Sequence, residues 1–272
     1  MLGAVIGDMV GGGYREHPTH SYRITLEDGR FVMTENTVLA AAVCDLMHYC
    51  REPANGRIER MIRSREVTDM LKKYARVYPG MLPDTVRKWS ARRRHFHSVA
   101  QADFSPVFSV ACAYTYETLD DVLSQTELLC SDICDTSSSR KCAKAVNSAL
   151  YALARGAEKD SIADYVVGLD VDCEYEIAAE QLALERTPES AVRAGFEAFT
   201  RSYDFDSALR YAVAYGAMSP TVAAVAGALA GEYYKEYPEQ LVKLTYGSLD
   251  IMLRLPLERF LQQHGIADFL GK

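Results

Sequence analysis

The sequence has no long apolar run, no cysteine pair in C-x-x-C spacing and no excess of positive charge. No stretch approaches the ~20 apolar residues that a membrane-spanning helix needs. Residues 1–8 carry no cationic segment of the kind that opens a signal peptide. The formal net charge is -7, whereas proteins that bind nucleic acid usually carry the opposite charge. We therefore expect a cytoplasmic protein that contacts neither a membrane nor nucleic acid.

The seven cysteines do not follow the spacing of zinc ligands or of a thiol redox motif. Zinc ribbons and thioredoxin-like sites need C-x-x-C pairs. Cys130 and Cys134 are one helical turn apart, but no further Cys or His completes a ligand set around them. Most of the cysteines stand among apolar or alanine-rich neighbours, where a free thiol packs as a small core side chain. We expect them to be reduced.

What the sequence does contain is a globular composition and a strong helical period. The 272 residues are 49% hydrophobic and 25% charged, which suffices for a sizeable core. Apolar side chains recur at i, i+3, i+4 and i+7 over most of the chain. The pattern predicts an all-α fold, with one compact multi-helix domain over residues 1–272 and no linker that divides it. Helices are expected at residues 37–50, 66–77, 106–118, 119–132, 140–155, 159–168, 174–185, 189–200, 205–215, 220–235 and 238–247.

Two segments are predicted to depart from the helical pattern. Residues 20–33 alternate apolar and polar side chains around Asp28-Gly29, a dipeptide typical of two-residue turns, and this predicts a small β-hairpin. Residues 11–13 are three successive glycines that match no P-loop. We interpret them as a flexible turn, because glycine favours irregular backbone.

Several predicted helices begin with a residue that can cap them. Thr34, Thr187 and either Asp204 or Asp206 stand at the start of an apolar helical pattern, and their side-chain oxygens can accept a hydrogen bond from a first-turn N–H. Ser219 followed by Pro220 predicts an N-cap before a proline at the first helical position.

Short motifs occur in a fixed order along nearly the whole chain. They are GAVIGDMVG at residues 3–11, MTENT at residues 33–37, Lys88-Trp89 followed by SPV at residues 105–107, and AVAYGAMSPTVAAVAGALAG at residues 212–231. Together they resemble the ADP-ribosylglycohydrolase family, which has G-A-x-x-G-D-x-x-G, T-D-D-T, K-W with S-P-V, and G-G-D-S-D-T before an alanine-rich helix. The resemblance covers most of the chain and implies an ADP-ribosylglycohydrolase-like, all-α globule.

The resemblance also implies a chemistry. Members of the family hold two Mg²⁺ or Mn²⁺ ions where helix-start loops converge, and they release ADP-ribose from a protein side chain, a small molecule or a polymer. On this chain it implies ligand contacts at Asp8, Gly11 and Gly12, and in the stretch before the SPV motif, where Ser98 and Asp103 stand.

The chain departs from the family at the metal ligands. The two loops here hold Thr34, Glu35, Asn36, Met218, Pro220 and Thr221. Asn36 offers only a neutral oxygen, Met218 offers a soft thioether that magnesium does not favour, and Pro220 offers no ligating side chain. Arg15 stands where the family often has an acid after its opening motif.

Charge arithmetic predicts the consequence. Two divalent ions bring four positive charges, and of the loop carboxylates that the family supplies only Glu35 is kept. At ~4 Å, each lost charge pair forfeits about 4 kcal/mol of attraction at an effective dielectric of 20. We expect no paired-metal site and no required cofactor. A single weakly held Mg²⁺ or Mn²⁺ near Glu35, Thr34 and Thr221 is the most that these residues leave open.

Three hypotheses follow, and the sequence leaves open whether the protein is an enzyme. The leading one is a catalytically inactive or impaired family member that acts as a binding or regulatory module for an ADP-ribose-like small molecule or a protein partner. The second is an active ADP-ribosyl hydrolase with a reorganised metal site, in which Glu35, Asp8 and a further acid, Glu16 or Asp103, serve as ligand or general base. The third is a purely structural helical protein.

Overall fold

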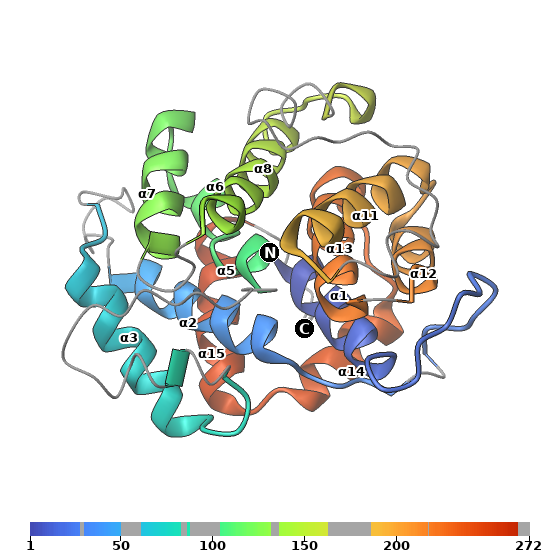
Figure 1. Cartoon of the computed structure of the whole chain (residues 1–272), viewed down its shortest axis with the longest axis horizontal. Helices are drawn as coiled ribbons and strands as arrows, with labels where there is room; N and C mark the ends of the chain where they lie inside the picture. Colours follow the sequence, from blue (N-terminus) through green and yellow to red (C-terminus); the bar gives the residue numbers. More distant parts are fainter. Residues whose placement is uncertain are drawn as a thin grey trace.

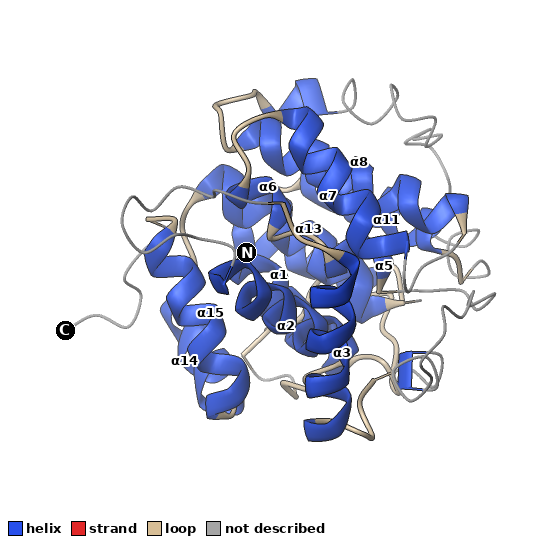
Figure 2. Ribbon diagram, turned by 90° about the vertical axis from the view of Figure 1, so that its left-hand side faces the viewer, coloured by secondary structure: helices blue, strands red, loops and turns tan. Residues whose placement is uncertain are grey.

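The computed structural model describes residues 1–27, 30–49, 61–82, 86–87, 104–131, 136–162, 186–216 and 218–265. Within these ranges every regular element is a helix and none is a strand, as Figure 2 shows. The all-α prediction is therefore confirmed. No helix in the described part of the chain combines the length and the apolar character needed to cross a bilayer.

Two buried helices form the centre of the molecule. These are α1 (Leu2–Gly13) and α13 (Ser219–Tyr234), which lie side by side near the middle of Figure 1. Residues of α1 are buried on every side of the helix, and so are those of α13 through Glu232. A helix that is apolar all round is stable only inside a protein, so these two helices define where the core sits.

The contact between α1 and α13 depends on glycine. Gly3, Gly7 and Gly11 recur every fourth residue on one face of α1, and a Cβ atom added to them would lie 2.0, 2.0 and 2.2 Å from backbone carbonyl oxygens of α13. Only a residue without a side chain permits this approach. The oxygens belong to Gly227, Ala223 and Ser219, which are also spaced by four.

The predicted flexible turn at residues 11–13 is wrong, because these glycines form the last turn of α1. A Cβ atom on Gly12 or Gly13 would lie 1.9 Å from the carbonyl oxygen of Val32 or Arg30 respectively. The glycines therefore serve close packing inside a helix. Their low helix propensity hid α1 from the periodicity analysis.

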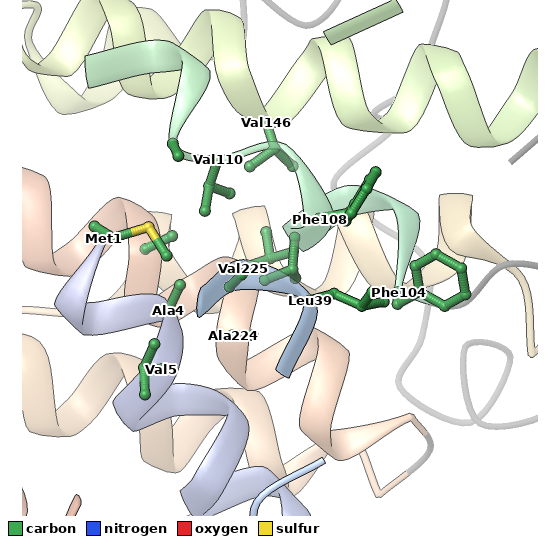
Figure 3. Close-up of a cluster of buried hydrophobic side chains, with 14 of the residues drawn as sticks. Met1, Ala4, Val5, Leu39, Phe104, Phe108, Val110, Val146, Ala224 and Val225 are labelled. Atoms are coloured by element: carbon green, nitrogen blue, oxygen red, sulfur yellow. The ribbon is translucent and has the colours of Figure 1, made fainter. Parts of the chain in front are cut away.

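The remaining helices surround this pair. They are α2 (Glu35–Tyr49), α3 (Ser64–Val77), α5 (Ser105–Phe108), α6 (Cys112–Thr115), α7 (Leu119–Ser131), α8 (Ser137–Leu153), the short 3₁₀ helix η1 (Lys159–Ser161), α11 (Pro188–Arg201), α12 (Phe205–Ala214), α14 (Glu239–Ser248) and α15 (Ile251–Gln263). Helices α11 and α12 pack on α13, α15 packs on α2, and α7 packs on α8. Figure 3 shows Leu39, Phe108, Val146 and Val225 meeting from α2, α5, α8 and α13.

The predicted hairpin at residues 20–33 is also wrong. The described part of this segment contains no strand, and Asp28 and Gly29 lie outside the described residues. The N–H of Val32 donates to the carbonyl oxygen of Met9 at 3.0 Å. The backbone of Arg30 and Val32 also lies against Gly13 and Gly12, so this segment packs on the C-terminal part of α1.

The predicted caps of α11 and α12 are present. Thr187 accepts a hydrogen bond from the N–H of Ser190 at 3.2 Å, and Asp204 accepts one from the N–H of Ser207 at 2.7 Å. Each satisfies a first-turn donor that the helix itself leaves without a partner. These local contacts explain why the starts of both helices could be read from the sequence.

The described cysteines are buried, and none of them is joined to another in a disulfide, namely Cys44, Cys112, Cys130 and Cys142. Burial raises the pKa of the Cys44 thiol well above its ordinary value, which disfavours the reactive thiolate. These four therefore pack as core residues, as the sequence predicted. The other three cysteines lie outside the described residues.

Candidate functional site

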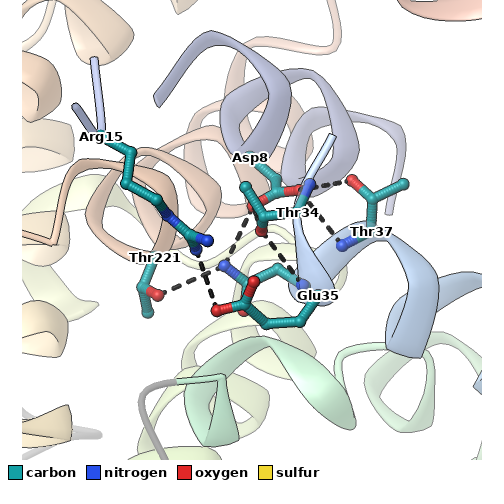
Figure 4. A network of polar contacts seen from close by, with 7 residues as sticks. Asp8, Arg15, Thr34, Glu35, Thr37 and Thr221 are labelled. Carbon is teal, nitrogen blue, oxygen red and sulfur yellow. Dashed lines mark hydrogen bonds and ion pairs between the residues drawn. The ribbon is translucent and has the colours of Figure 1, made fainter. Parts of the chain in front are cut away.

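The carboxylate of Asp8 lies in the middle of α1 and faces the start of α2 (Figure 4). It accepts hydrogen bonds from the N–H and hydroxyl of Thr34 at 3.1 and 2.5 Å, and from the N–H and hydroxyl of Thr37 at 3.2 and 2.6 Å. The side-chain amide of Asn36 donates a further hydrogen bond at 3.0 Å. A carboxylate has about four lone-pair sites, so these donors fill its accepting capacity.

The position of Asp8 has a physical cost that this network offsets. Burial raises the pKa of the Asp8 carboxyl above its ordinary value, and the hydrogen bonds from Thr34, Thr37 and Asn36 oppose that shift. The N-terminus of α2 also attracts negative charge. Asp8 therefore ties α1 to the first turn of α2, and its oxygens face protein donors.

Thr34 and Asn36 connect three helices at this point. The hydroxyl of Thr34 accepts a hydrogen bond from the N–H of Asn36 at 3.2 Å, which confirms the predicted cap of α2. The side-chain amide of Asn36 donates both to Asp8 and, at 3.2 Å, to the hydroxyl of Thr221 at the start of α13. The Asn36 carbonyl oxygen is buried and has no partner within the described residues. Asn36 thus acts as a donor, a role that an ionised aspartate cannot take.

Glu35, the retained carboxylate, is paired with a cation. Its Oε1 lies 2.9 Å from a guanidinium nitrogen of Arg15, just beyond the end of α1 (Figure 4). The side chain of Glu35 is 19% exposed and that of Arg15 is 43% exposed. The sequence named both positions, but their contact is a finding of the structure. The positive charge of Arg15 neutralises the negative charge of Glu35 that a metal ion would need.

The two helix-start loops border one pocket. It has a volume of about 280 Å³ and lies at the N-terminus of α13, where Ser219, Pro220 and Thr221 form part of its wall. The remaining lining residues are Arg15, Pro18, Glu35, Arg186, Gly216 and Met218. Two of the lining residues are cations and one is an anion, so the described wall carries a net positive charge.

The first turn of α13 differs from the prediction. Its N-cap is Met218, and Ser219 and Pro220 are already helical, so the prediction of Ser219 as the cap is wrong. Met218 has φ 49° and ψ 30° and makes no side-chain cap hydrogen bond. This left-handed conformation costs a residue such as Met about 1 kcal/mol. Gly216, two residues earlier, also has a positive φ, of 77°.

Comparisons with known proteins agree with this arrangement. A family model described as ADP-ribosylglycohydrolase matches residues 1–263. The chain belongs to the ADP-ribosylglycohydrolase family. A solved structure titled "ADP-ribosylglycohydrolase-related protein complex" has the same fold, with a TM-score of 0.68, 18% identity and 95% of each chain covered. No curated protein matches the chain.

The metal pair that this family implies does not fit these residues. Asp8 has its oxygens occupied by five donors, Glu35 is paired with Arg15, and Met218 and Pro220 supply no hard oxygen ligand. Within the described ranges, no three His, Cys, Asp or Glu side chains come together as a possible metal site. The hard-oxygen donor set for two divalent cations is therefore missing from the described wall.

Other residues implied by the resemblance lie elsewhere. Ser98 and Asp103 are outside the described residues. Gly11 and Gly12 are not among the residues that line the pocket, because their faces pack on Ser219 and on Val32. Arg186 is a pocket residue that no sequence pattern predicted. It stands immediately before the cap of α11 and carries no motif, so only the folded chain places it in the pocket.

Proposed function

We propose that this member of the ADP-ribosylglycohydrolase family lacks paired-metal hydrolysis and acts as a binding or regulatory module for an ADP-ribose-like ligand. The observation that carries the proposal is the 2.9 Å ion pair between Arg15 and Glu35, beside Met218 and Pro220 in the pocket wall. A divalent cation entering here would have to displace Arg15 from the retained carboxylate. It would also approach Arg186, which repels it.

The alternative of an active hydrolase relies first on Glu35 and Asp8 as metal ligand or general base. Glu35 is engaged by a guanidinium, which favours the ionised carboxylate but also blocks one of its oxygens. Asp8 is fully buried and accepts five hydrogen bonds, so a substrate proton cannot reach it without breaking the network. Both contacts favour the binding module over the hydrolase.

The proposal is tested by calorimetry with Mg²⁺ and Mn²⁺, and by assays for release of ADP-ribose from modified arginine and serine peptides. We expect no micromolar two-site metal binding and no metal-dependent release. Two-site binding, or release that is abolished by Glu35→Gln, would establish the active hydrolase instead. Absence of ADP-ribose binding in a thermal shift experiment would favour the purely structural hypothesis.

A designed restoration sharpens this test. Met218→Asp and Pro220→Asp combined with Arg15→Ala return two carboxylates to the pocket and free Glu35. The matched control carries Met218→Asn, Pro220→Asn and Arg15→Ala, which have nearly the same shape without the two added charges. We expect the aspartate variant to bind Mn²⁺ on the order of tenfold more tightly than the control, or better. Equal binding would show that the missing carboxylates do not explain the weak metal binding expected of the natural chain.

A further inference from the structure

The pocket at the start of α13 has the charge of an anion site. Arg15 and Arg186 both line it, and the one lining carboxylate, Glu35, is already paired with Arg15. After that pairing, the charge of Arg186 remains uncompensated by any other acidic residue of the described wall. The same loops that do not suit divalent cations therefore suit a negatively charged group.

We propose that this pocket binds a phosphate or diphosphate group of its ligand. The inference deepens the proposed function and rests on it for the class of ligand, a nucleoside diphosphate sugar such as ADP-ribose. The volume of about 280 Å³ is just below the ~300 Å³ at which pockets for whole small molecules begin. It accommodates a phosphate or a diphosphate, with the rest of a nucleotide extending outside.

The backbone at the N-terminus of α13 also favours an anion. Helix α13 is 16 residues long, and its N-terminus forms part of the pocket wall. The N-cap Met218 makes no side-chain hydrogen bond to the first turn, so no side chain of the N-cap residue occupies those N–H groups. The partial positive charge of a helix N-terminus and its first-turn N–H groups favour a phosphate.

Two buried hydroxyls supply independent support. Ser219 is 1% exposed and belongs to the pocket wall, and its hydroxyl has no hydrogen-bond partner within the described residues. The hydroxyl of Thr221, which is 4% exposed, accepts from Asn36, and no described residue accepts from it in turn. Buried polar groups are normally hydrogen-bonded, so a buried hydroxyl without an acceptor in a residue of the pocket wall would gain one by turning toward a bound ligand. Phosphate oxygens are such acceptors.

The role of Glu35 distinguishes an anion site from a metal site. In a metal site Glu35 would be a ligand, and Glu35→Gln would weaken binding. In an anion site it repels the ligand and draws Arg15 toward itself, so Glu35→Gln would strengthen binding. The sign of this single effect separates the two kinds of site without any measurement of catalysis.

The experiment is calorimetric titration of the full chain with inorganic phosphate, pyrophosphate and ADP-ribose, at constant ionic strength and without divalent ions. We expect Arg186→Ala to weaken pyrophosphate binding about tenfold and Glu35→Gln to strengthen it several-fold. The matched control is Arg65→Ala, which removes one charge from a 92% exposed arginine on α3 and should change nothing. Arg186 is itself exposed, so we expect its replacement to leave the thermal midpoint unchanged.

The outcomes are distinct. Tighter binding of ADP-ribose than of pyrophosphate, with both weakened by Arg186→Ala, assigns the pocket to a nucleotide diphosphate, and equal binding assigns it to free diphosphate. No binding of either phosphate, or weakening by Glu35→Gln, overturns this inference. Binding of ADP-ribose that Arg186→Ala does not affect overturns it as well, while leaving the proposed function intact. Phosphate binding together with metal-dependent hydrolysis would overturn the proposed function and leave this inference intact.

Discussion

The contact between α1 and α13 and the pocket at one end of that contact obey different constraints. Within the contact, Gly3, Gly7 and Gly11 meet the backbone of Gly227, Ala223 and Ser219 so closely that no side chain fits between them. Beyond the contact, Arg15 and Met218 line the pocket. The glycines cannot take a side chain unless a helix moves, whereas we expect the residues that line the pocket to tolerate a change of side chain.

Asp8 shows why motif membership does not by itself indicate catalysis. It belongs to the opening motif that the chain shares with its family, yet its oxygens are occupied by Thr34, Thr37 and Asn36. These contacts join α1 to α2. Like the glycines of α1, Asp8 therefore holds helices together, and it differs in this from the residues that line the pocket.

The largest effect on stability is expected from Asp8, and its absence would contradict the packing role given to this residue. Asp8→Ala leaves five buried donors without their acceptor, and we expect it to lower the free energy of unfolding by about 4 kcal/mol. Chemical denaturation measures this loss. The control Glu239→Gln removes the charge of an exposed carboxylate that pairs with Lys243, and should leave the denaturation midpoint where it is. A stable Asp8→Ala protein would mean that Asp8 is kept for a ligand.

A smaller loss is expected from the glycine contact. The Cβ atom introduced by Gly7→Ala would lie 2.0 Å from the carbonyl oxygen of Ala223, and separating the helices should cost about 3 kcal/mol. Gly247→Ala is the matched control, because Gly247 is also helical but has nothing within 4 Å of the added atom. It should raise the free energy of unfolding by about 0.5–1 kcal/mol. Similar results for both variants would refute the packing role of α1.

The smallest effect concerns the pocket end of α13. Met218→Asn places at φ 49° a residue that tolerates the left-handed region, and should raise the free energy of unfolding by about 1 kcal/mol. Met218→Leu keeps the strain and serves as the control. A thermal midpoint that rises for Met218→Asn and stays level for Met218→Leu would show that the backbone beside the pocket is strained at Met218. If Met218→Asn is no more stable than Met218→Leu, the left-handed conformation of Met218 costs no measurable stability.

Local signals explain what could be predicted. Residues 189–200 and 205–215 were expected to be helical and match α11 and α12 closely, because Thr187 and Asp204 cap them through neighbours three residues away. The expected helix at 106–118 is divided into the short α5 and α6. Helix α15 was not predicted, and it contains an internal Pro256 that interrupts the usual helical signal.

For the site, the resemblance brought the loops around residues 34–36 and 218–221 together, and the structure joins them through the 3.2 Å contact between Asn36 and Thr221. It could not show that Arg15 reaches Glu35, that Arg186 enters the same pocket or that Asp8 is fully hydrogen-bonded. These contacts link positions far apart in the chain. No local spacing encodes them.

The sequence by itself determined the helical class, the capped starts of several helices and the shortage of carboxylates at residues 34–36 and 218–221, because periodicity, capping and ligand chemistry depend on residue type and near neighbours. Tertiary structure decided that a glycine-rich opening becomes a buried helix and that two arginines face one pocket. Both outcomes depend on long-range packing. The glycines of α1 are buried against the backbone of α13, and the charged residues of the pocket come from segments that only folding brings together.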